Sequence, residues 1–230
     1  MTHPAPRFQG FAAPAFQFFR GLAAQNERGW FLAHKDIYET AVKAPMLDLV
    51  ADLSDALAAR TVPLMGQEGK AMFRPNRDVR FSKDKSPYKT NAGIVLGRDG
   101  GPRSQGVLYV QIGAEGGFAA LGFYQLDPAA LGALRDQIVH DPAAWRQLTA
   151  RLGKHGLALR REASLTRLPR GYDTAAAVGL EEDLRLKSFI LTVPLSVAEF
   201  GNPALAGHLA DFARNGCGLL EFGWHALTAA

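Results

Sequence analysis

The stretch VLYVQIGAEGGFAALGFYQ, residues 107–125, determines the fold class, because its side chains follow a period of two. Successive side chains of a β-strand point to opposite faces, so this period is typical of strands. We expect strands at 71–74, 78–82, 92–96, 107–112, 117–125 and 188–193. Residues 97–106, GRDGGPRSQG, are rich in turn-forming residues and indicate a hairpin loop between two of these strands.

Helices are expected on both sides of this strand region. A capping side chain followed by proline marks three helix starts, at Asp127-Pro128, Asp141-Pro142 and Asn202-Pro203. Apolar residues follow each start at helical spacing. The N-terminal part predicts a short helix after Pro14, a second helix over residues 30–42 and a third from Pro45. The expected buried stripe of this third helix is Met46, Val50, Leu53 and Leu57.

This order of elements predicts an α+β fold with a mostly antiparallel sheet, on which N-terminal, central and C-terminal helices pack. No stretch is long or polar enough to act as a linker, so we expect a single domain over residues 1–230. Its parts are a helical region at 14–60, a sheet-forming region at 71–125, helices at 127–153, and a strand with helices at 187–229.

The composition of the 230 residues is that of a globular protein, with 47% hydrophobic and 21% charged residues. Cys217 is the single cysteine, so no intramolecular disulfide can form and a reducing compartment is expected. The sequence has neither a signal-peptide pattern nor an apolar run of the ~20 residues that a membrane span needs. We expect a cytoplasmic protein without a membrane partner. No histidine pair or Cys-x-x-Cys motif predicts a metal site, and the cofactors and oligomeric state stay unknown.

Basic residues are concentrated in one short segment. Residues 70–89 contain seven basic and two acidic residues, a net charge of +5, whereas the rest of the chain has 19 basic and 20 acidic residues. Charge gathered in this way produces a local field that attracts anions. The segment includes RDVRFSKDKSPYKTN, residues 77–91.

We interpret this segment as a strand, a charged loop and a second strand, bracketed by Pro75 and Pro87. Alternation would turn Val79 and Phe81 towards the core, and Asp78, Arg80 and Ser82 towards the other face. The cations would then gather at one end of the sheet. Arginine forks bind carboxylate or phosphate oxygens in pairs, and lysines act as point charges.

The segment therefore predicts a binding site for an anion, a phosphate or a carboxylate. A phosphorylated small molecule or a nucleotide fits best. Asp78 would orient Arg80, while Ser82 and Tyr88 would donate hydrogen bonds to the ligand. If the site has a chemical step, Asp78 or Asp84 is the expected acid–base residue. The residues expected to bind the ligand are Arg77, Arg80, Ser82, Lys83, Lys85, Tyr88 and Lys89.

Three stretches resemble one family. Residues 77–89, RDVRFSKDKSPYK, are similar to the central motif of the family called domain of unknown function 2461. Asn26 with Trp30-Phe31, and the later stretches 169–172 and 187–189, resemble further elements of that family. Pro75-Asn76 departs from its pattern, since an aliphatic residue is expected first. The resemblance supplies no activity, cofactor or catalytic assignment.

Two other interpretations use the same segment. In the first, a nucleic-acid backbone binds the row of cations while Phe81 or Tyr88 stacks on a base. In the second, the motif is purely structural, and Asp78 and Asp84 pair with arginines and lysines to fix the sheet. Steep salt dependence would indicate the first interpretation, and loss of stability without loss of ligand binding would indicate the second.

Overall fold

The computed structural model describes residues 6–67, 69–78, 80, 84–101, 104–162, 164–172 and 178–229. It confirms the α+β class, with four strands that all pair antiparallel. The strands are β1 (Asn91–Leu96), β2 (Val107–Gly113), β3 (Gly116–Phe123) and β4 (Phe189–Leu195). The helices are α1 (Ala13–Ala24), α2 (Arg28–Ala33), α3 (Lys35–Ile37), the π-helix η1 (Tyr38–Lys43), α4 (Ala44–Ala59), α5 (Pro128–His140), α6 (Pro142–Lys154), α7 (Glu181–Leu184), α8 (Val197–Phe200) and α9 (Leu205–Ala229).

The sheet has the order β1-β2-β3-β4. It is also wider than these four strands, because a further segment pairs with each of its two edge strands. Residues 97–106 join β1 to β2, as expected for a hairpin loop. At the β1 edge, the Phe73 amide donates to the Gly93 carbonyl at 2.9 Å. At the β4 edge, the Arg160 amide donates to the Ile190 carbonyl at 3.0 Å. Segments far apart in the sequence therefore extend the same sheet on both sides.

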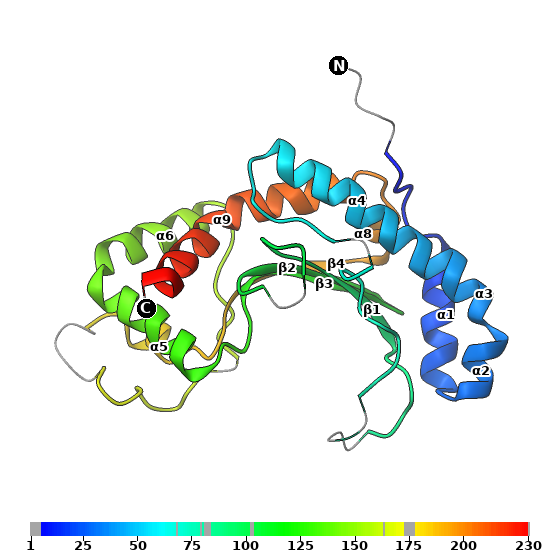
Figure 1. The fold of residues 1–230 in the computed structure, drawn as a ribbon, viewed down its shortest axis with the longest axis horizontal. Coiled ribbons are helices and arrows are strands. Elements are labelled where there is room, and N and C mark those ends of the chain that lie inside the picture. The colour runs from blue at the N-terminus through cyan, green and yellow to red at the C-terminus, as the bar shows by residue number, and fades with distance from the viewer. Residues whose placement is uncertain are drawn as a thin grey trace.

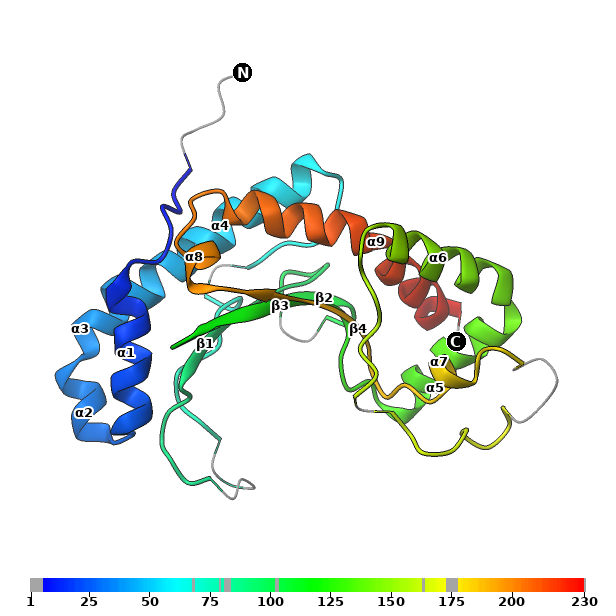
Figure 2. The same cartoon turned by 180° about the vertical axis from the view of Figure 1, so that it is seen from behind.

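Helices cover one face of the sheet and leave the other face open. Figures 1 and 2 show α4 and α9 above the sheet, with α1 to α3 at one end and α5 to α7 at the other, so that the molecule forms an arch. Alternation along β2 explains the layering, because Leu108, Val110 and Ile112 are fully buried against the helices. Tyr109 and Gln111 point to the open face. The stripe expected on α4 is also buried.

The expected helix starts are found close to the predicted positions. Asp127 accepts hydrogen bonds from the amides of Ala129 and Ala130, each at 2.9 Å, and begins α5. Asp141 caps α6 through the Ala144 amide. Asn202 accepts from the Ala204 amide at 2.9 Å, and α9 begins one residue later. Local side-chain capping therefore fixes these three starts.

The single helix expected over residues 30–42 is divided. It contains the end of α2, the short α3 and most of η1, where the Ala44 amide bonds to the Glu39 carbonyl five residues back. Pro45 has no amide hydrogen to donate to the preceding turn, so the helix widens into a π-turn before α4. Proline thus changes the helix without ending it.

The strand expected at 78–82 is not found at Asp78 or Arg80, the residues of that range which the structure describes. The Asp78 carboxylate accepts a hydrogen bond from the Arg80 amide at 3.2 Å, a local bond that competes with strand pairing. Val79, Phe81 and Ser82 lie outside the described residues. Pairing persists up to Arg77, whose amide donates to the Pro87 carbonyl at 2.9 Å.

Residues 71–73 pair with β1, and residues 74–78 and 84–90 continue from there as an extended, two-stranded projection, called the arm below. Its two segments pair at Asn76 and Tyr88, and the Lys89 amide donates to the Pro75 carbonyl at 2.8 Å. The arm continues from the β1 edge and lies beside the open face of the sheet (Figure 1). The basic segment of the sequence is therefore placed next to this face.

Candidate functional site

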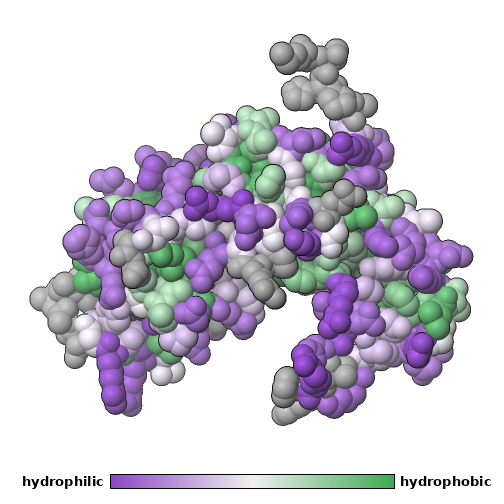
Figure 3. All heavy atoms as spheres, viewed as in Figure 1, coloured by the Kyte–Doolittle hydropathy of each residue, from purple (hydrophilic) through white to green (hydrophobic). Residues whose placement is uncertain are grey.

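A cavity of about 930 Å³ lies on the open face of the sheet. Its floor comes from all four strands, with the arm on one side and Arg160 on the other. Figure 3 shows that the molecule is hollowed on this side and that hydrophilic residues border the hollow. Small-molecule sites commonly have volumes of about 300–1,000 Å³, so the cavity can hold more than a single inorganic ion.

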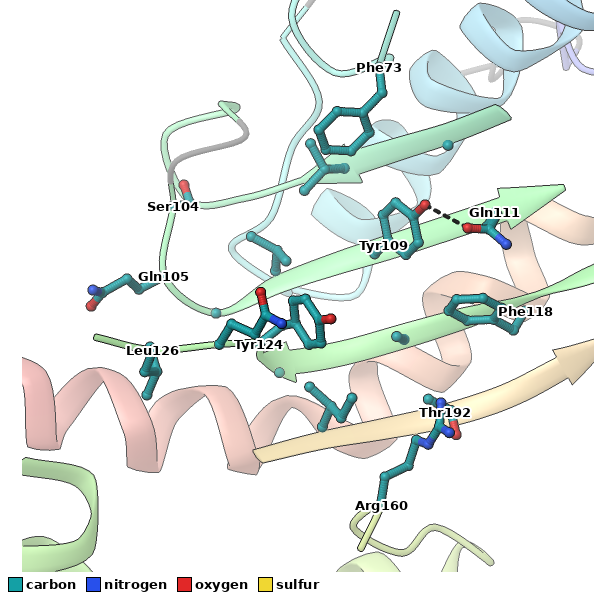
Figure 4. Close-up of a pocket in the computed structure, with 18 of the residues that line it drawn as sticks. Phe73, Ser104, Gln105, Tyr109, Gln111, Phe118, Tyr124, Leu126, Arg160 and Thr192 are labelled. Carbon is teal, nitrogen blue, oxygen red and sulfur yellow. Dashed lines mark hydrogen bonds between the residues drawn. The ribbon is translucent and has the colours of Figure 1, made fainter. Parts of the chain in front are cut away.

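The floor of the cavity is partly aromatic. Tyr109 lies between Phe73 and Phe118, with ring centroids 6.0 and 5.8 Å away (Figure 4). Its hydroxyl donates to Oε1 of Gln111 at 3.0 Å. The ring lies across Gly93 on β1, where an added Cβ would come within 2.6 Å of the Tyr109 hydroxyl. Glycine at this position therefore lets Tyr109 lean towards β1.

Small side chains deepen the floor beside this aromatic row. Ala120 on β3 lies opposite Tyr109 on β2 and opposite Thr192 on β4. Gly122 follows on the same face of β3 and also lines the cavity. Because Tyr109 leans away towards β1, the surface above Ala120 stays open between the Tyr109 ring and the Thr192 hydroxyl.

Three cations from the arm form one wall of the cavity: Arg74, Arg77 and Lys89. Lys89 Nζ donates to the Arg74 carbonyl at 3.2 Å and lies 5.4 Å from the centre of the Phe73 ring. Burial lowers the pKa of Lys89, and the charges of Arg74 and Arg77 lower it further. Two of the predicted ligand-binding residues, Arg77 and Lys89, thus meet at the cavity.

Arg77 is held by two partners within the arm. Its Nη1 lies 2.8 Å from Oδ2 of Asp84, and its Nε and Nη2 each donate to the Tyr88 carbonyl at 3.4 Å. The Arg77 side chain is 28% exposed, while that of Asp84 is 53% exposed. The guanidinium is therefore oriented from one side and open to the cavity on another.

Asp78 and Arg80 pair with each other. Arg80 donates from Nη2 to Oδ2 of Asp78 at 2.7 Å and from Nε to Oδ1 at 3.0 Å, so Asp78 does orient Arg80 as expected. The hydrogen bonds from the Arg80 side chain and amide hold the pKa of Asp78 far below its usual range. Both residues are exposed, and neither is among the described residues that line the cavity.

Asp84 makes a compact turn at the end of the arm. Its Oδ1 accepts hydrogen bonds from the Ser86 amide at 2.9 Å and from the Ser86 hydroxyl at 2.7 Å. These bonds, together with the charge of Arg77, lower the pKa of Asp84. A general acid or base works best with a pKa near the working pH, so neither Asp78 nor Asp84 has the pKa of a proton-transfer group at neutral pH.

Tyr88 has a different environment from the one expected for a ligand donor. Its side chain is 6% exposed, and its ring stacks on Phe31 with centroids 4.1 Å apart. The Asn26 carboxamide accepts from the Tyr88 amide at 3.1 Å and donates to the Tyr88 carbonyl at 3.0 Å. Tyr88 thus anchors the arm to the N-terminal helices, and its partners Asn26 and Phe31 both belong to the N-terminal motif.

The remaining predicted residues divide into two groups. Lys85 is exposed at the end of the arm and is not among the described residues that line the cavity. Ser82 and Lys83 lie outside the described residues. As a whole, the prediction that Asp78 and Asp84 are catalytic, and that the other seven residues bind a ligand, stays a prediction.

Sequence reasoning missed several residues of the cavity, namely Arg74, Tyr109, Gln111, Phe118, Arg160 and Thr192. Arg74 was counted in the basic segment but not assigned to the site. Tyr109 and Gln111 carried a usable signal, because they alternate with the buried residues of β2 and so had to face away from the helices. The pairing of distant strands, which brings Arg160 and Thr192 to the same face, leaves no comparable local pattern.

Other chemistry has little support in the part of the chain that the structure describes. Within it, no three histidine, cysteine or acidic side chains gather in a way that could hold a metal ion. Burial, followed by the nearby Glu221 carboxylate, raises the pKa of Cys217 to about 11, so this thiol is a poor nucleophile. No helix in the described ranges is both long and apolar enough to cross a membrane.

The fold and the cavity define a class of protein in which an antiparallel sheet, covered by helices on one face, presents a cationic hollow on the other. The chain belongs to the family described as conserved hypothetical protein (DUF2461), whose model matches residues 14–222. No curated protein and no solved structure matches the chain. The match includes the arm, the sheet and most of the helices, and its description assigns no activity.

Proposed function

We propose that the protein binds a small molecule carrying a phosphate or a carboxylate, and that the anionic group lies at the wall formed by Arg74, Arg77 and Lys89. The observation that carries this proposal is the meeting of three cations at one side of a cavity. Among the described residues, no carboxylate lies within ion-pair distance of Arg74 or Lys89. Two of the three charges are therefore available to a ligand.

The electrostatics of Lys89 support an anion. Burial and the neighbouring arginines lower the pKa of Lys89, which means that its ammonium is less strongly favoured than that of an ordinary lysine. A bound phosphate or carboxylate supplies the opposite charge and restores the preference for the ammonium. The two arginines add paired donors that suit the oxygens of either group.

The structural interpretation explains part of the motif but not this wall. Asp78 pairs with Arg80 and Asp84 pairs with Arg77, which gives both acids a role within the arm. Such exposed ion pairs contribute little to stability. The interpretation leaves unexplained why Arg74 and Lys89 share a cavity wall although, among the described residues, neither has an acidic side chain within ion-pair distance; the charge of Arg74 acts on Asp78 only from further away.

Calorimetric titration with inorganic phosphate, pyrophosphate, ribose 5-phosphate and citrate tests the proposal. We expect at least one of these anions to bind, and Arg74→Ala to weaken that binding at least tenfold. Arg151→Ala is the matched control, since this exposed arginine of α6 lies outside the cavity lining. Absence of binding by every anion, or equal affinity in wild type and Arg74→Ala, would reject the proposal.

Two further measurements separate the alternatives. Arg80→Ala distinguishes the cavity from the end of the arm, because Arg80 pairs with Asp78 outside the cavity lining. A large loss of affinity for the small anions in Arg80→Ala would indicate that the anion binds at the end of the arm and not in the cavity. A short single-stranded oligonucleotide that binds far more tightly than the small anions, with a steep salt dependence, would favour a nucleic-acid interface.

A further inference from the structure

We infer that the ligand of this cavity is a nucleoside phosphate, whose base lies over Ala120 while its phosphate reaches Arg74, Arg77 and Lys89. This inference rests on the proposed function, because it takes the cationic wall as the phosphate site. It adds the class of the ligand and names the surface that recognises the rest of the molecule.

The cavity has room for a ligand larger than an anion alone. The cationic wall occupies one side, whereas the floor extends across β1, β2, β3 and β4. A free phosphate would fill only a small part of about 930 Å³. A ligand that fills the cavity would therefore have a second part, which lies on the floor of the sheet.

The floor has the surface that a flat aromatic ring would need. Tyr109 and Phe118 present aromatic side chains 5.8 Å apart, and Ala120 leaves the surface open beside them. Stacking on aromatic side chains is a common way for proteins to hold nucleic-acid bases. Branched aliphatic or charged side chains above Ala120 would have closed this surface, but the cross-strand neighbours are the Tyr109 ring and the smaller Thr192.

Polar groups at the border of this surface can bond to the edge of a base. The Tyr109 hydroxyl donates to Oε1 of Gln111, which leaves the Gln111 amide nitrogen as a donor (Figure 4). The Thr192 side chain lies on β4, on the other side of Ala120 from Tyr109, and its hydroxyl can both donate and accept. A sugar has hydroxyls for these groups but no aromatic ring to stack on Tyr109 and Phe118.

The base surface and the phosphate wall are close enough to be used together. Phe73 connects them, since its ring lies 6.0 Å from the Tyr109 ring and 5.4 Å from Lys89 Nζ. The ammonium is therefore separated from Tyr109 by a single ring. A nucleoside phosphate has this arrangement, with a flat base joined through ribose to the anionic group.

The experiment compares each of AMP, GMP, CMP and UMP with ribose 5-phosphate, which carries the same phosphate on the same sugar without a base. We expect at least one nucleotide to bind about tenfold more tightly than ribose 5-phosphate to the wild type. In Ala120→Val, the added methyl groups occupy the base surface, and this preference should fall to about one while ribose 5-phosphate binds unchanged.

Ala120→Val should fold, because a β-branched residue suits a strand and its side chain would face the cavity. Phe118→Leu provides a second variant that removes the aromatic face and keeps an apolar side chain; it should lower the preference several-fold. The inference is overturned if wild type binds nucleotides and ribose 5-phosphate equally, or if both variants keep the preference. Failure of the proposed function would give a different result: ribose 5-phosphate and the nucleotides would all fail to bind, or they would bind wild type and Arg74→Ala with equal affinity.

Discussion

Single side chains of the arm have distinct tasks, although the sequence presents them as one block of charge. Arg77 is oriented by Asp84 and the Tyr88 carbonyl. Arg80 forms an ion pair with Asp78. The ammonium of Lys89 donates a hydrogen bond to the Arg74 carbonyl. The charge pattern of the sequence alone does not distinguish these cations from one another. Their partners determine which of them can serve a ligand.

The lowered pKa of Lys89 predicts a pH dependence of anion binding. A bound anion favours the ammonium, so affinity is full while Lys89 is protonated and falls as the pH rises through its pKa. Because that pKa is lowered, the fall should begin at a less alkaline pH than an ordinary lysine would give. Titrations of ribose 5-phosphate at increasing pH should show this fall in wild type. The Lys89→Met variant should bind ribose 5-phosphate more weakly at neutral pH, and its affinity should not show this alkaline fall. If the affinity of Lys89→Met falls over the same pH range, the fall belongs to another titrating group.

Asn26 predicts a measurable contribution to stability. Its carboxamide bonds to both the amide and the carbonyl of Tyr88, and Asn26→Ala would leave the amide without this acceptor, while the carbonyl keeps its bonds from Arg77. We expect a loss of about 1–3 kcal/mol in the free energy of unfolding, measured by urea denaturation. Glu27→Ala is the control, because Glu27 is exposed and makes no side-chain cap bond, and it should stay within about 0.5 kcal/mol. Equal stability of the two variants would show that the arm does not depend on Asn26.

Among the elements, the sheet and the helix starts could be predicted from local patterns, and the arm could not. Alternation along residues 107–112 fixed the faces of β2, and Asp127 and Asp141 marked helix starts by capping chemistry that needs only neighbouring residues. At the arm, Asp78 bonds to the Arg80 amide, so the strand expected there is lost. Arg74 and Arg77 both line the cavity although they are three residues apart, which strict alternation would not allow. The cavity itself depends on β4 and Arg160, whose pairing partners are distant in sequence.

The arm and the central strands should differ in hydrogen exchange. The amides of β2 lie between β1 and β3, under α9 and α4, whereas the arm is joined by few backbone bonds, such as those of Arg77 and Lys89. Few bonds and a position at the edge lower the free energy of local opening. Exchange followed by NMR should therefore be faster for the Arg77 and Lys89 amides than for those of Val110 and Ile112. Equal protection would mean that the arm opens only with the whole sheet.

For the whole molecule, α9 suggests how the two ends of the arch are joined. This helix of 25 residues packs against α4 at one end and against α5 and α6 at the other, and it also contacts β3. We therefore keep the prediction that residues 1–230 form a single domain. Calorimetry should show one unfolding transition, with equal calorimetric and van't Hoff enthalpies. Two transitions, one of them unaffected by a substitution in the sheet such as Ala119→Gly, would indicate separate domains.

The arch gives the molecule one open sheet face with a charged border, and the central claim is that an anionic group binds at that border. A crystal structure of the protein grown with saturating ribose 5-phosphate tests this claim most directly. We predict density for the phosphate within hydrogen-bonding distance of the side chains of Arg74 and Lys89, on the cavity side of the arm. A phosphate bound at Arg80 and Lys85 instead, or a cavity that stays empty at saturation, would contradict it.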